Sequence, residues 1–285
     1  MFYYNEKIDT NGVIYSVDMI RLNIVFFSEK QQLFCDNLSN YENNGNIIIT
    51  YYSSFKFLNF RHLWKIDCKY SDVVNDMCTV TIGMDFYGYK ESRDLGFIEF
   101  NPNKCMNSKY FCEILELVKN ASLHMRLNRY DLAIDIPTER RNVRLVRDRR
   151  KYELIENKGS LTEYLGKRSE SGFVKLYDKQ KESDLKYVLT RLELTLDTEK
   201  TIDKVFPEVY IVDTQKVLYN ATDLNDTELV LLELLTNSDT PQYYLKRCGR
   251  VVQNKLKNYL VYDNIFNYND KICRELRVFV ESFVV

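Results

Sequence analysis

The sequence predicts an α+β protein, with an antiparallel sheet in the N-terminal two-thirds and a more helical C-terminal part. Up to about residue 197, β-branched and aromatic runs alternate with turn signals, and helical spacing interrupts them in a few places. From about residue 200, apolar residues recur at helical intervals. At 285 residues and 45% hydrophobic content, the chain is long enough to bury one large core or two smaller ones.

The expected strands follow one another along the chain, separated by Gly, Asn and Pro. Pro102 ends one of them and Pro137 another. Two strands resemble each other, because "YSVDMIRLNI" and "NRYDLAIDIP" both hold an Asp inside an apolar run and both precede a helix. This similarity has two interpretations, duplicated halves or chance. The predicted strands are residues 13–26, 47–57, 78–89, 97–104, 127–137, 172–179 and 189–197.

The expected helices are recognised by apolar residues at helical spacing. Ser108 is a candidate N-cap for one of them, because its side chain can accept a hydrogen bond from a backbone N–H of the first turn. The predicted helices are residues 29–41, 108–121, 139–151, 225–237 and 241–262.

The composition excludes several classes of protein. The N-terminus lacks the basic and apolar regions of a signal peptide, and no run approaches the roughly 18–20 apolar residues of a membrane span. Seven cysteines never form CxxC, and His62 and His124 lie far apart. We therefore expect a cytoplasmic protein without a zinc site or a histidine triad. Any metal would be held mainly by carboxylates, which favour Mg²⁺ or Mn²⁺.

Basic residues gather in three segments, although the net charge is only −1. Residues 139–151 hold seven basic and two acidic residues, and residues 167–181 hold five and two. Residues 246–257 hold five basic residues and no acidic one. Basic patches on an acidic remainder suit a protein that binds a polyanion at one place. For a single run, a solvated helical face is the ordinary alternative.

Four strands have one apolar face and one face with reactive groups. If they share a sheet, the second face gathers carboxylates, basic groups and one tyrosine. Clustered carboxylates repel one another unless a divalent cation joins them, and a solvated sheet face is the alternative. The residues are Glu99, Arg129, Asp131, Asp135, Lys175, Tyr177, Lys179, Arg191 and Glu193.

This combination suggests phosphoryl transfer from DNA to Tyr177. A free phenol has a pKa of about 10, so only about 0.1% is ionised at neutral pH. We expect Lys175 and Lys179 to raise that fraction, and a metal to polarise the scissile phosphate.

Four blocks, in this order and at these separations, resemble the rolling-circle replication initiators of small Gram-positive plasmids. This is the Rep-trans group, which includes replication factors and relaxases of conjugative transposons. The resemblance covers about residues 15–200 and is weak beyond them. It departs at Asp178, where many members have Asn, and at Gly249 and Val251–Val252 inside the C-terminal basic run. The blocks are "IEFNPNK" (98–104), "LNRYDLAIDI" (127–136), "YLGKRSESGFVKLYDKQKE" (164–182) and "LTRLELTL" (189–196).

The resemblance implies a domain arrangement and an activity. Residues 1–200 would form a nicking domain like that of HUH relaxases but without the histidine pair. Residues 201–285 would form a helical C-terminal region with an origin-recognition segment near 241–262. The enzyme would bind a plasmid double-strand origin with a hairpin or cruciform nick site. It would nick one strand through a 5′-phosphotyrosyl intermediate and rejoin it at termination.

The resemblance also implies roles for particular residues and partners. Tyr177 would be the nucleophile, assisted by Lys175, Lys179 and Arg191. A host superfamily-one helicase and a second copy of the chain would be partners. The implied Mg²⁺ or Mn²⁺ ligands are Asp131, Asp135, Glu193 and Glu99, and the implied DNA-binding residues are Arg168, Lys246, Arg247, Arg250, Lys255 and Lys257.

Three alternatives remain open from the sequence. A conjugative relaxase or mobilisation nickase would use the same chemistry at a transfer origin. A DNA-binding module without catalysis would use Tyr177 only to stack on a base. A structural protein with a solvated sheet face would have no affinity for DNA.

Overall fold

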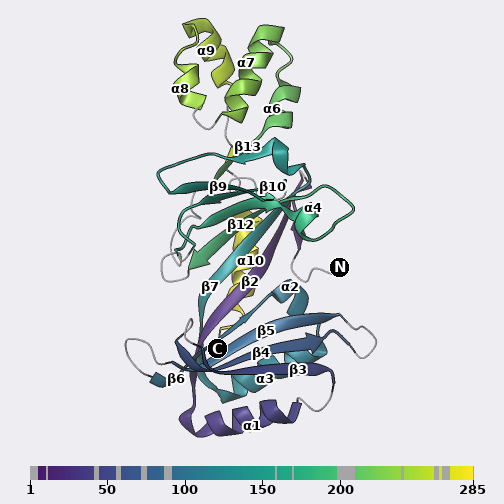
Figure 1. The fold of residues 1–285 in the computed structure, drawn as a ribbon, viewed down its shortest axis with the longest axis vertical. Helices are drawn as coiled ribbons and strands as arrows, with labels where there is room; N and C mark the ends of the chain where they lie inside the picture. The colour runs from purple at the N-terminus through teal and green to yellow at the C-terminus, as the bar shows by residue number, and fades with distance from the viewer. Residues whose placement is uncertain are drawn as a thin grey trace.

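An antiparallel sheet forms the body of the molecule (Figure 1). The computed structural model describes residues 6–10, 12–41, 45–55, 59–71, 76–86, 92–157, 159–168, 170–197, 209–238, 241–259, 263–264 and 270–284. Within these residues the sheet has eleven strands. They are β1 (Lys7–Ile8), β2 (Ile14–Phe26), β3 (Ile47–Phe55), β4 (Phe60–Lys69), β5 (Met77–Phe86), β6 (Ser92–Phe100), β7 (Ser122–Ile136), β9 (Tyr152–Asn157), β10 (Ser160–Leu165), β11 (Val174–Asp178) and β12 (Thr190–Asp197).

Helices and a small second sheet complete the described fold, so the predicted α+β class with an antiparallel sheet is confirmed. The second sheet pairs β8 (Val143–Leu145), β13 (Tyr210–Asp213) and β14 (Asp263–Asn264). The α-helices are α1 (Gln31–Tyr41), α2 (Pro102–Cys105), α3 (Lys109–Ala121), α4 (Lys179–Glu182), α6 (Thr214–Asn220), α7 (Asp226–Asn237), α8 (Pro241–Leu245), α9 (Arg250–Lys257) and α10 (Asp270–Glu281). No described helix has the length and apolar character needed to cross a lipid bilayer.

The sheet has the same strand order on both sides of its centre. The order is β3-β4-β5-β6-β2-β7-β12-β11-β10-β9, with β2 and β7 adjacent in the middle, and the eleventh strand, β1, pairs with β2 outside this order. In each half, a long strand precedes a meander of four strands, and the last of the four returns to pair with the long strand. The two strands that resemble each other in sequence are therefore topologically equivalent and directly paired.

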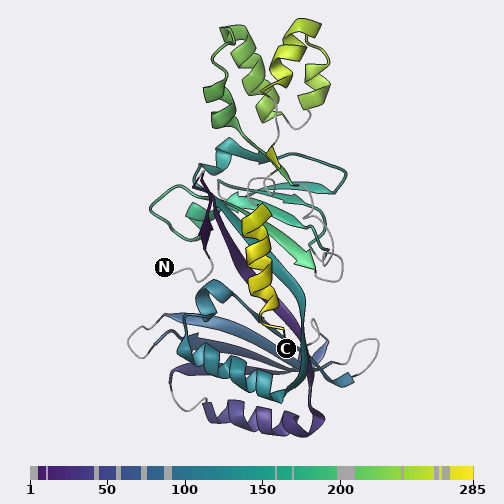
Figure 2. The ribbon, with the colours of Figure 1, turned by 180° about the vertical axis from the view of Figure 1, so that it is seen from behind.

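Helices cover one face of the sheet. Figure 2 shows α10 lying along the central strands, while α1 and α3 lie together at the far end. Leu276 and Val280 of α10 are buried in the same core as Tyr130, Leu132 and the other apolar residues of β7. Because side chains alternate along a strand, the residues between these apolar ones point to the opposite face.

The ends of several helices match the sequence signals. The Ser108 hydroxyl accepts a hydrogen bond from the Phe111 N–H at 3.2 Å, which confirms the predicted cap of α3. Asn225 and Glu228 form a reciprocal capping box at the start of α7.

The basic segment 139–151 is not the predicted helix. A 3₁₀ turn at Arg140–Asn142 is followed by β8, which pairs with β13. Arg140 is buried and donates to Glu163 Oε1 at 2.5 Å and to backbone carbonyls. It is therefore not part of a solvated helical face. The alternating burial of Val143 and Leu145 favours a strand over a helix.

The chain beyond residue 208 contributes to three parts of the structure. The helices α6–α9 share a separate small core, β13 and β14 join the second sheet, and α10 packs on the main sheet. The predicted helix over 241–262 is two helices, α8 and α9, with a turn at 246–249 between them. Residues 260–262 and the boundary expected near residue 200 lie outside the described residues.

Candidate active site

Strand register brings the predicted site residues into adjacent rows on the polar face of the sheet. Tyr177 of β11 lies opposite Arg191 of β12, which lies opposite Asp135 of β7. In the next row, Lys175 lies opposite Glu193. Directly opposed side chains in an antiparallel sheet are close enough to interact. The register therefore decides which of these residues become partners.

Tyr177 is paired with Glu193. The Tyr177 hydroxyl donates to Glu193 Oε1 at 2.5 Å, and Lys175 Nζ lies 3.7 Å from the centre of the phenol ring. Lys175 Nζ is also 3.7 Å from Glu193 Oε2. The tyrosine is only 4% exposed.

This setting stabilises the neutral phenol. Burial, and secondly the charge of Glu193, raise the pKa of Tyr177, while Arg191 opposes the shift. The expectation that Lys175 and Lys179 increase the phenolate fraction is therefore wrong for this arrangement. The ammonium of Lys175 lies over the ring, and the carboxylate is the group that contacts the hydroxyl.

Lys179 lies at the edge of this cluster. Its Nζ donates to Glu182 Oε2 at 2.6 Å and is 5.8 Å from the centre of the Tyr177 ring. Asp178 caps the short helix α4 by accepting from the Lys181 N–H at 3.0 Å. The lysine is thus placed near Tyr177 by the turn from β11 into α4.

Arg191 connects three strands through a buried ion pair. Its Nε and Nη2 donate to the two oxygens of Asp135 at 2.6 and 2.7 Å, and its Nη1 donates to Asp18 Oδ1 at 3.0 Å. Asn101 donates to the same oxygen of Asp18 at 3.2 Å. Both oxygens of Asp135 are therefore engaged by the guanidinium.

Asp18 is a site residue that strand alternation in the sequence did not predict. It sits where the register of β2 and β7 shifts between Val17 and Met19, so a bulge directs its side chain toward Arg191. The signal was present in "YSVDMIRLNI", since Asp is unusual inside an apolar strand.

Asp131 has weaker contacts than Asp135 or Glu193. Its Oδ1 is buried without a hydrogen bond, and its Oδ2 lies 3.8 Å from Arg129 Nη2. Burial raises the pKa of Asp131 to about 6, although the charge of Arg129 and a hydrogen bond from Thr195 oppose the shift; the charge of Glu193 adds to it. Burial also raises the pKa of Glu193.

Asp131 and Glu193 are the carboxylates of the site that could take part in holding a divalent cation. Among the described residues, no three His, Cys, Asp or Glu side chains are arranged to hold a metal. Mg²⁺ near a phosphate commonly uses only one or two protein carboxylates, with substrate oxygens and water supplying the rest. Asp131 has an unpartnered oxygen and a charge that a cation would stabilise. Asp135 is held by Arg191, and Glu99 lies 3.5 Å from Arg21 on another strand pair.

The predicted DNA-binding residues lie apart from Tyr177. Arg168 is exposed in the turn between β10 and β11. The others belong to α9 or the turn before it, in the group of helices that lies beyond β13 and outside the main sheet (Figure 1). Lys255 Nζ donates to Glu228 Oε2 at 2.7 Å and therefore ties α9 to α7.

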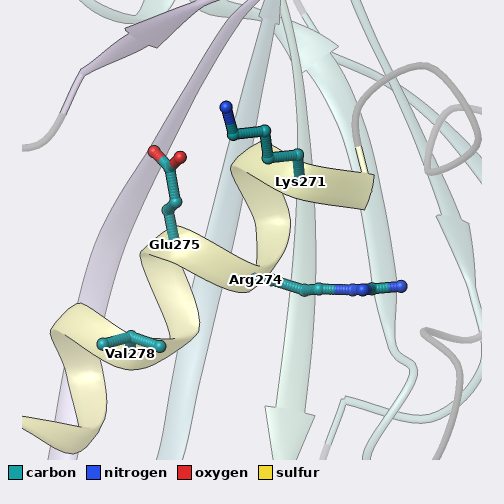
Figure 3. Close-up of a pocket in the computed structure, with 4 residues that line it drawn as sticks. All are labelled: Lys271, Arg274, Glu275 and Val278. Atoms are coloured by element: carbon teal, nitrogen blue, oxygen red, sulfur yellow. The ribbon is translucent and has the colours of Figure 1, made fainter.

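A cavity of about 490 Å³ on α10 does not belong to this site. It is lined by Lys271, Arg274, Glu275 and Val278, and Figure 3 shows these side chains along the helix. Because α10 packs on the apolar face of β7, the cavity and Tyr177 are on opposite sides of the sheet.

A solved structure shows a weak likeness to most of the chain. It is a rolling circle replication initiator protein from Geobacillus stearothermophilus, with 15% sequence identity and a TM-score of 0.35. The alignment covers 87% of this chain and 97% of that one. No protein-family model and no curated protein matches the sequence. At that identity and TM-score, a functional assignment depends on the geometry of the site itself.

Proposed function

We propose that the chain is a replication initiator that binds a plasmid double-strand origin and nicks one strand through Tyr177. The observation that carries the proposal is the Tyr177–Glu193 hydrogen bond of 2.5 Å, next to the ammonium of Lys175. A nucleophilic hydroxyl in contact with a proton acceptor is the arrangement that covalent catalysis requires. Basic residues on α9 and the preceding turn would hold the duplex.

In the proposed reaction, Tyr177 Oη attacks the scissile phosphorus while its proton moves to Glu193 Oε1. The bond between phosphorus and the 3′ oxygen breaks, and that oxygen takes a proton from solvent to leave a 3′-OH. The product is a 5′-phosphotyrosyl ester on Tyr177. Attack of a 3′-OH on this ester forms the bond between phosphorus and the 3′ oxygen and breaks the bond between phosphorus and Tyr177 Oη; the hydroxyl proton passes to solvent, and Glu193 returns its proton to the phenol oxygen.

The other residues of the site have positioning and electrostatic roles in this proposal. Lys175 and Lys179 offset the charge of the phosphate, since ammonium groups in a partly buried site stabilise a developing anion. Arg191 holds Asp135 and Asp18, and so fixes β12 against β7 and β2. A bound Mg²⁺ or Mn²⁺ would be held by Asp131 and Glu193 and would polarise the phosphate.

The burial of Tyr177 argues against its stacking on a base, and it supports a second candidate in which a DNA-binding module without catalysis uses Tyr177 only as a structural residue. A tyrosine that is 4% exposed and has a raised pKa is also what a structural hydrogen bond to Glu193 would produce. A conjugative relaxase is a variant of the first candidate with the same chemistry at a transfer origin. The predicted homodimer and helicase partner belong to the initiator proposal.

The test uses supercoiled plasmid that carries the DNA flanking the coding sequence of this chain, with Mg²⁺ or Mn²⁺. We expect the wild-type protein to produce nicked circles with a covalent adduct on Tyr177, identified by peptide mapping. Tyr177→Phe should abolish both. Tyr187→Phe is the matched control, because Tyr187 is close in sequence but 55% exposed. Undiminished nicking by Tyr177→Phe would overturn the assignment. DNA binding without any nicked product would support the module.

A further inference from the structure

Two arginines face each other across the central strand pair of the sheet. Arg21 of β2 lies directly opposite Arg129 of β7. Directly opposed residues of an antiparallel pair lie on the same face, and like charges in such a pair repel each other. Burial lowers the pKa of Arg21, and the charge of Arg129 lowers it further, although Glu99 opposes the shift. An anion between the two guanidinium groups would offset this repulsion.

An aromatic ring supports the guanidinium of Arg21. The Cζ atom of Arg21 lies 4.0 Å from the centre of the Phe97 ring, and Phe97 is 1% exposed. The ring lies against Gly83, where a Cβ atom would come within 2.2 Å of it. Glycine at this position therefore makes room for the ring beneath the guanidinium. Arg21 Nη1 is also 3.5 Å from Glu99 Oε2. A guanidinium stacked in this way keeps its N–H donors at its edge.

Arg129 keeps hydrogen-bonding capacity that its surroundings do not use. In the part of the chain that the structure describes, its Nε is buried without a hydrogen bond. Its Nη2 lies 3.8 Å from Asp131 Oδ2, which is longer than a hydrogen bond. A buried donor without an acceptor is unfavourable, and the side chain as a whole is 36% exposed. An acceptor from solvent can therefore reach this arginine.

The arginine pair lies on the same face of the sheet as Tyr177. Ala133 of β7 is opposite Glu193, which accepts the hydrogen bond of Tyr177. Arg129 is four residues from Ala133 along the same strand, and so points to the same face. At 3.4 Å per residue, this separation is about 14 Å. The pair is therefore too far from Tyr177 to hold the scissile phosphate of the proposed reaction, but a DNA strand that follows β7 would bring another phosphate to it.

We propose that Arg21 and Arg129 clamp one backbone phosphate of the DNA strand that Tyr177 cleaves, at a distance from the scissile phosphate. Guanidinium groups bind phosphate oxygens through paired N–H donors. A phosphate between the two side chains accepts hydrogen bonds from both and removes their repulsion. The side chains are 24% and 36% exposed, so a phosphate can reach them in partly buried surroundings that strengthen the contact. This inference rests on the proposed function, because it specifies how the cleaved strand is held on the sheet.

A purely structural pair is the alternative. Glu99 lies opposite Arg21 on β6, and Asp197 lies opposite Arg129 on β12, so two carboxylates flank the two arginines. If these acids balance the arginines, replacing either arginine by glutamine should lower the melting temperature of the DNA-free protein. If the pair is an empty phosphate clamp, the same variants should melt at the wild-type temperature or above it, because a repulsion is removed.

The experiment measures binding of a fluorescent oligothymidylate of about 12 nucleotides to the full-length chain, by anisotropy in a chelating buffer. Arg21→Gln and Arg129→Gln should each lower the affinity about tenfold. Because both arginines contact one phosphate, the double variant should lose less than the product of the two effects. Its slope of log affinity against log salt should fall by about 0.7, the value for one phosphate of a single strand.

Two further variants sharpen the result. Arg129→Lys should bind with intermediate affinity, because it keeps the charge and loses the paired donors. Arg277→Gln is the matched control and should change neither affinity nor salt slope. Arg277 is 27% exposed and pairs with Glu281 at 2.9 Å, but it belongs to α10, on the opposite face of the same central strands (Figure 2).

Unchanged affinity in both glutamine variants would overturn the clamp, and so would a lower melting temperature in both. Displacement of the oligonucleotide by an equal concentration of inorganic phosphate would mean that the site takes a free anion and not a strand. The nicking assay separates this inference from the proposed function. If wild-type protein nicks through Tyr177 and the arginine variants bind the oligonucleotide normally, only the clamp fails. If the variants lose binding and wild-type protein forms no adduct on Tyr177, the phosphate site stands and the nicking proposal fails.

Discussion

The Tyr177 hydroxyl donates a hydrogen bond of 2.5 Å to Glu193 Oε1, and both residues lie on the polar face of one antiparallel sheet. The two side chains come from adjacent strands, β11 and β12, which have 11 residues between them in the sequence. The contact depends on a register that opposes Lys175 to Glu193 and Tyr177 to Arg191. A slip of one residue would turn either side chain to the apolar face.

The first prediction concerns proton transfer from Tyr177. Glu193→Gln removes the proton acceptor, so the rate of covalent adduct formation should fall by about 10²–10⁴-fold. Glu182→Gln, which alters the partner of Lys179, should have a much smaller effect. The rates are measured on the plasmid substrate in single-turnover reactions. A wild-type rate in Glu193→Gln would show that another group accepts the proton.

The pH dependence gives a second test of the same residue. Burial raises the pKa of Glu193, so its ionised form is lost at a higher pH than for an ordinary glutamate, whose pKa is about 4.3. Only the ionised carboxylate can accept the proton of Tyr177. The wild-type nicking rate should therefore decrease as pH falls through this raised value, and Glu193→Gln should lose that limb of the profile.

Asp131 should make the stability of the protein depend on pH. Its pKa is about 6 in the folded state and about 3.9 when unfolded, so the native state binds the proton more tightly. Wild-type stability should fall as pH rises between these values. Asp131→Asn should be more stable than wild type at pH 8, by up to about 3 kcal/mol, and equal to it below about pH 3.5. Urea denaturation in a chelating buffer measures both, and equal stability at pH 8 would contradict the assigned burial effect.

A divalent cation bound at Asp131 should offset the unfavourable free energy of keeping its ionised carboxylate buried. Mn²⁺ that binds only the folded state raises its stability, by about 2.7 kcal/mol at a concentration 100 times the dissociation constant. Wild-type protein should show this rise in its melting temperature, and Asp131→Asn should not. Glu99→Gln should keep the rise, because Glu99 pairs with Arg21. An equal response in all three proteins would place the cation elsewhere.

The ion pair of Arg191 and Asp135 should be essential for stability. Arg191→Met leaves a carboxylate that is 5% exposed without its partner, and should cost about 3–5 kcal/mol in the free energy of unfolding. Replacing both residues, with Asp135→Leu added, should recover much of this loss. Lys167→Met breaks an exposed pair with Glu170 and should cost less than about 1 kcal/mol. A small loss for Arg191→Met would mean that water reaches Asp135.

Local signals predicted several strands and helices correctly but missed β4, β9, β10 and α10. The apolar alternation of β2, β7, β11 and β12 and the N-cap at Ser108 all appear in the structure where the sequence placed them. The prediction of a helix over 139–151 is wrong. Arg140 forms a buried ion pair with Glu163, and β8 pairs with β13. A partner from a distant part of the chain leaves no trace in local periodicity.

The sequence by itself determined which side chains share a face, since a strand alternates with a period of two and the apolar positions fix which side is buried. That was enough to place Asp131, Asp135, Tyr177, Arg191 and Glu193 together. Only the tertiary structure decided who contacts whom. The pairing of the strands brings Tyr177 into hydrogen-bonding contact with Glu193 and Arg191 into contact with Asp135. A bulge in β2 brings Asp18 into contact with Arg191 as well. Burial then raised the pKa values of Tyr177, Asp131 and Glu193, because desolvation depends on packing by residues far away in the chain.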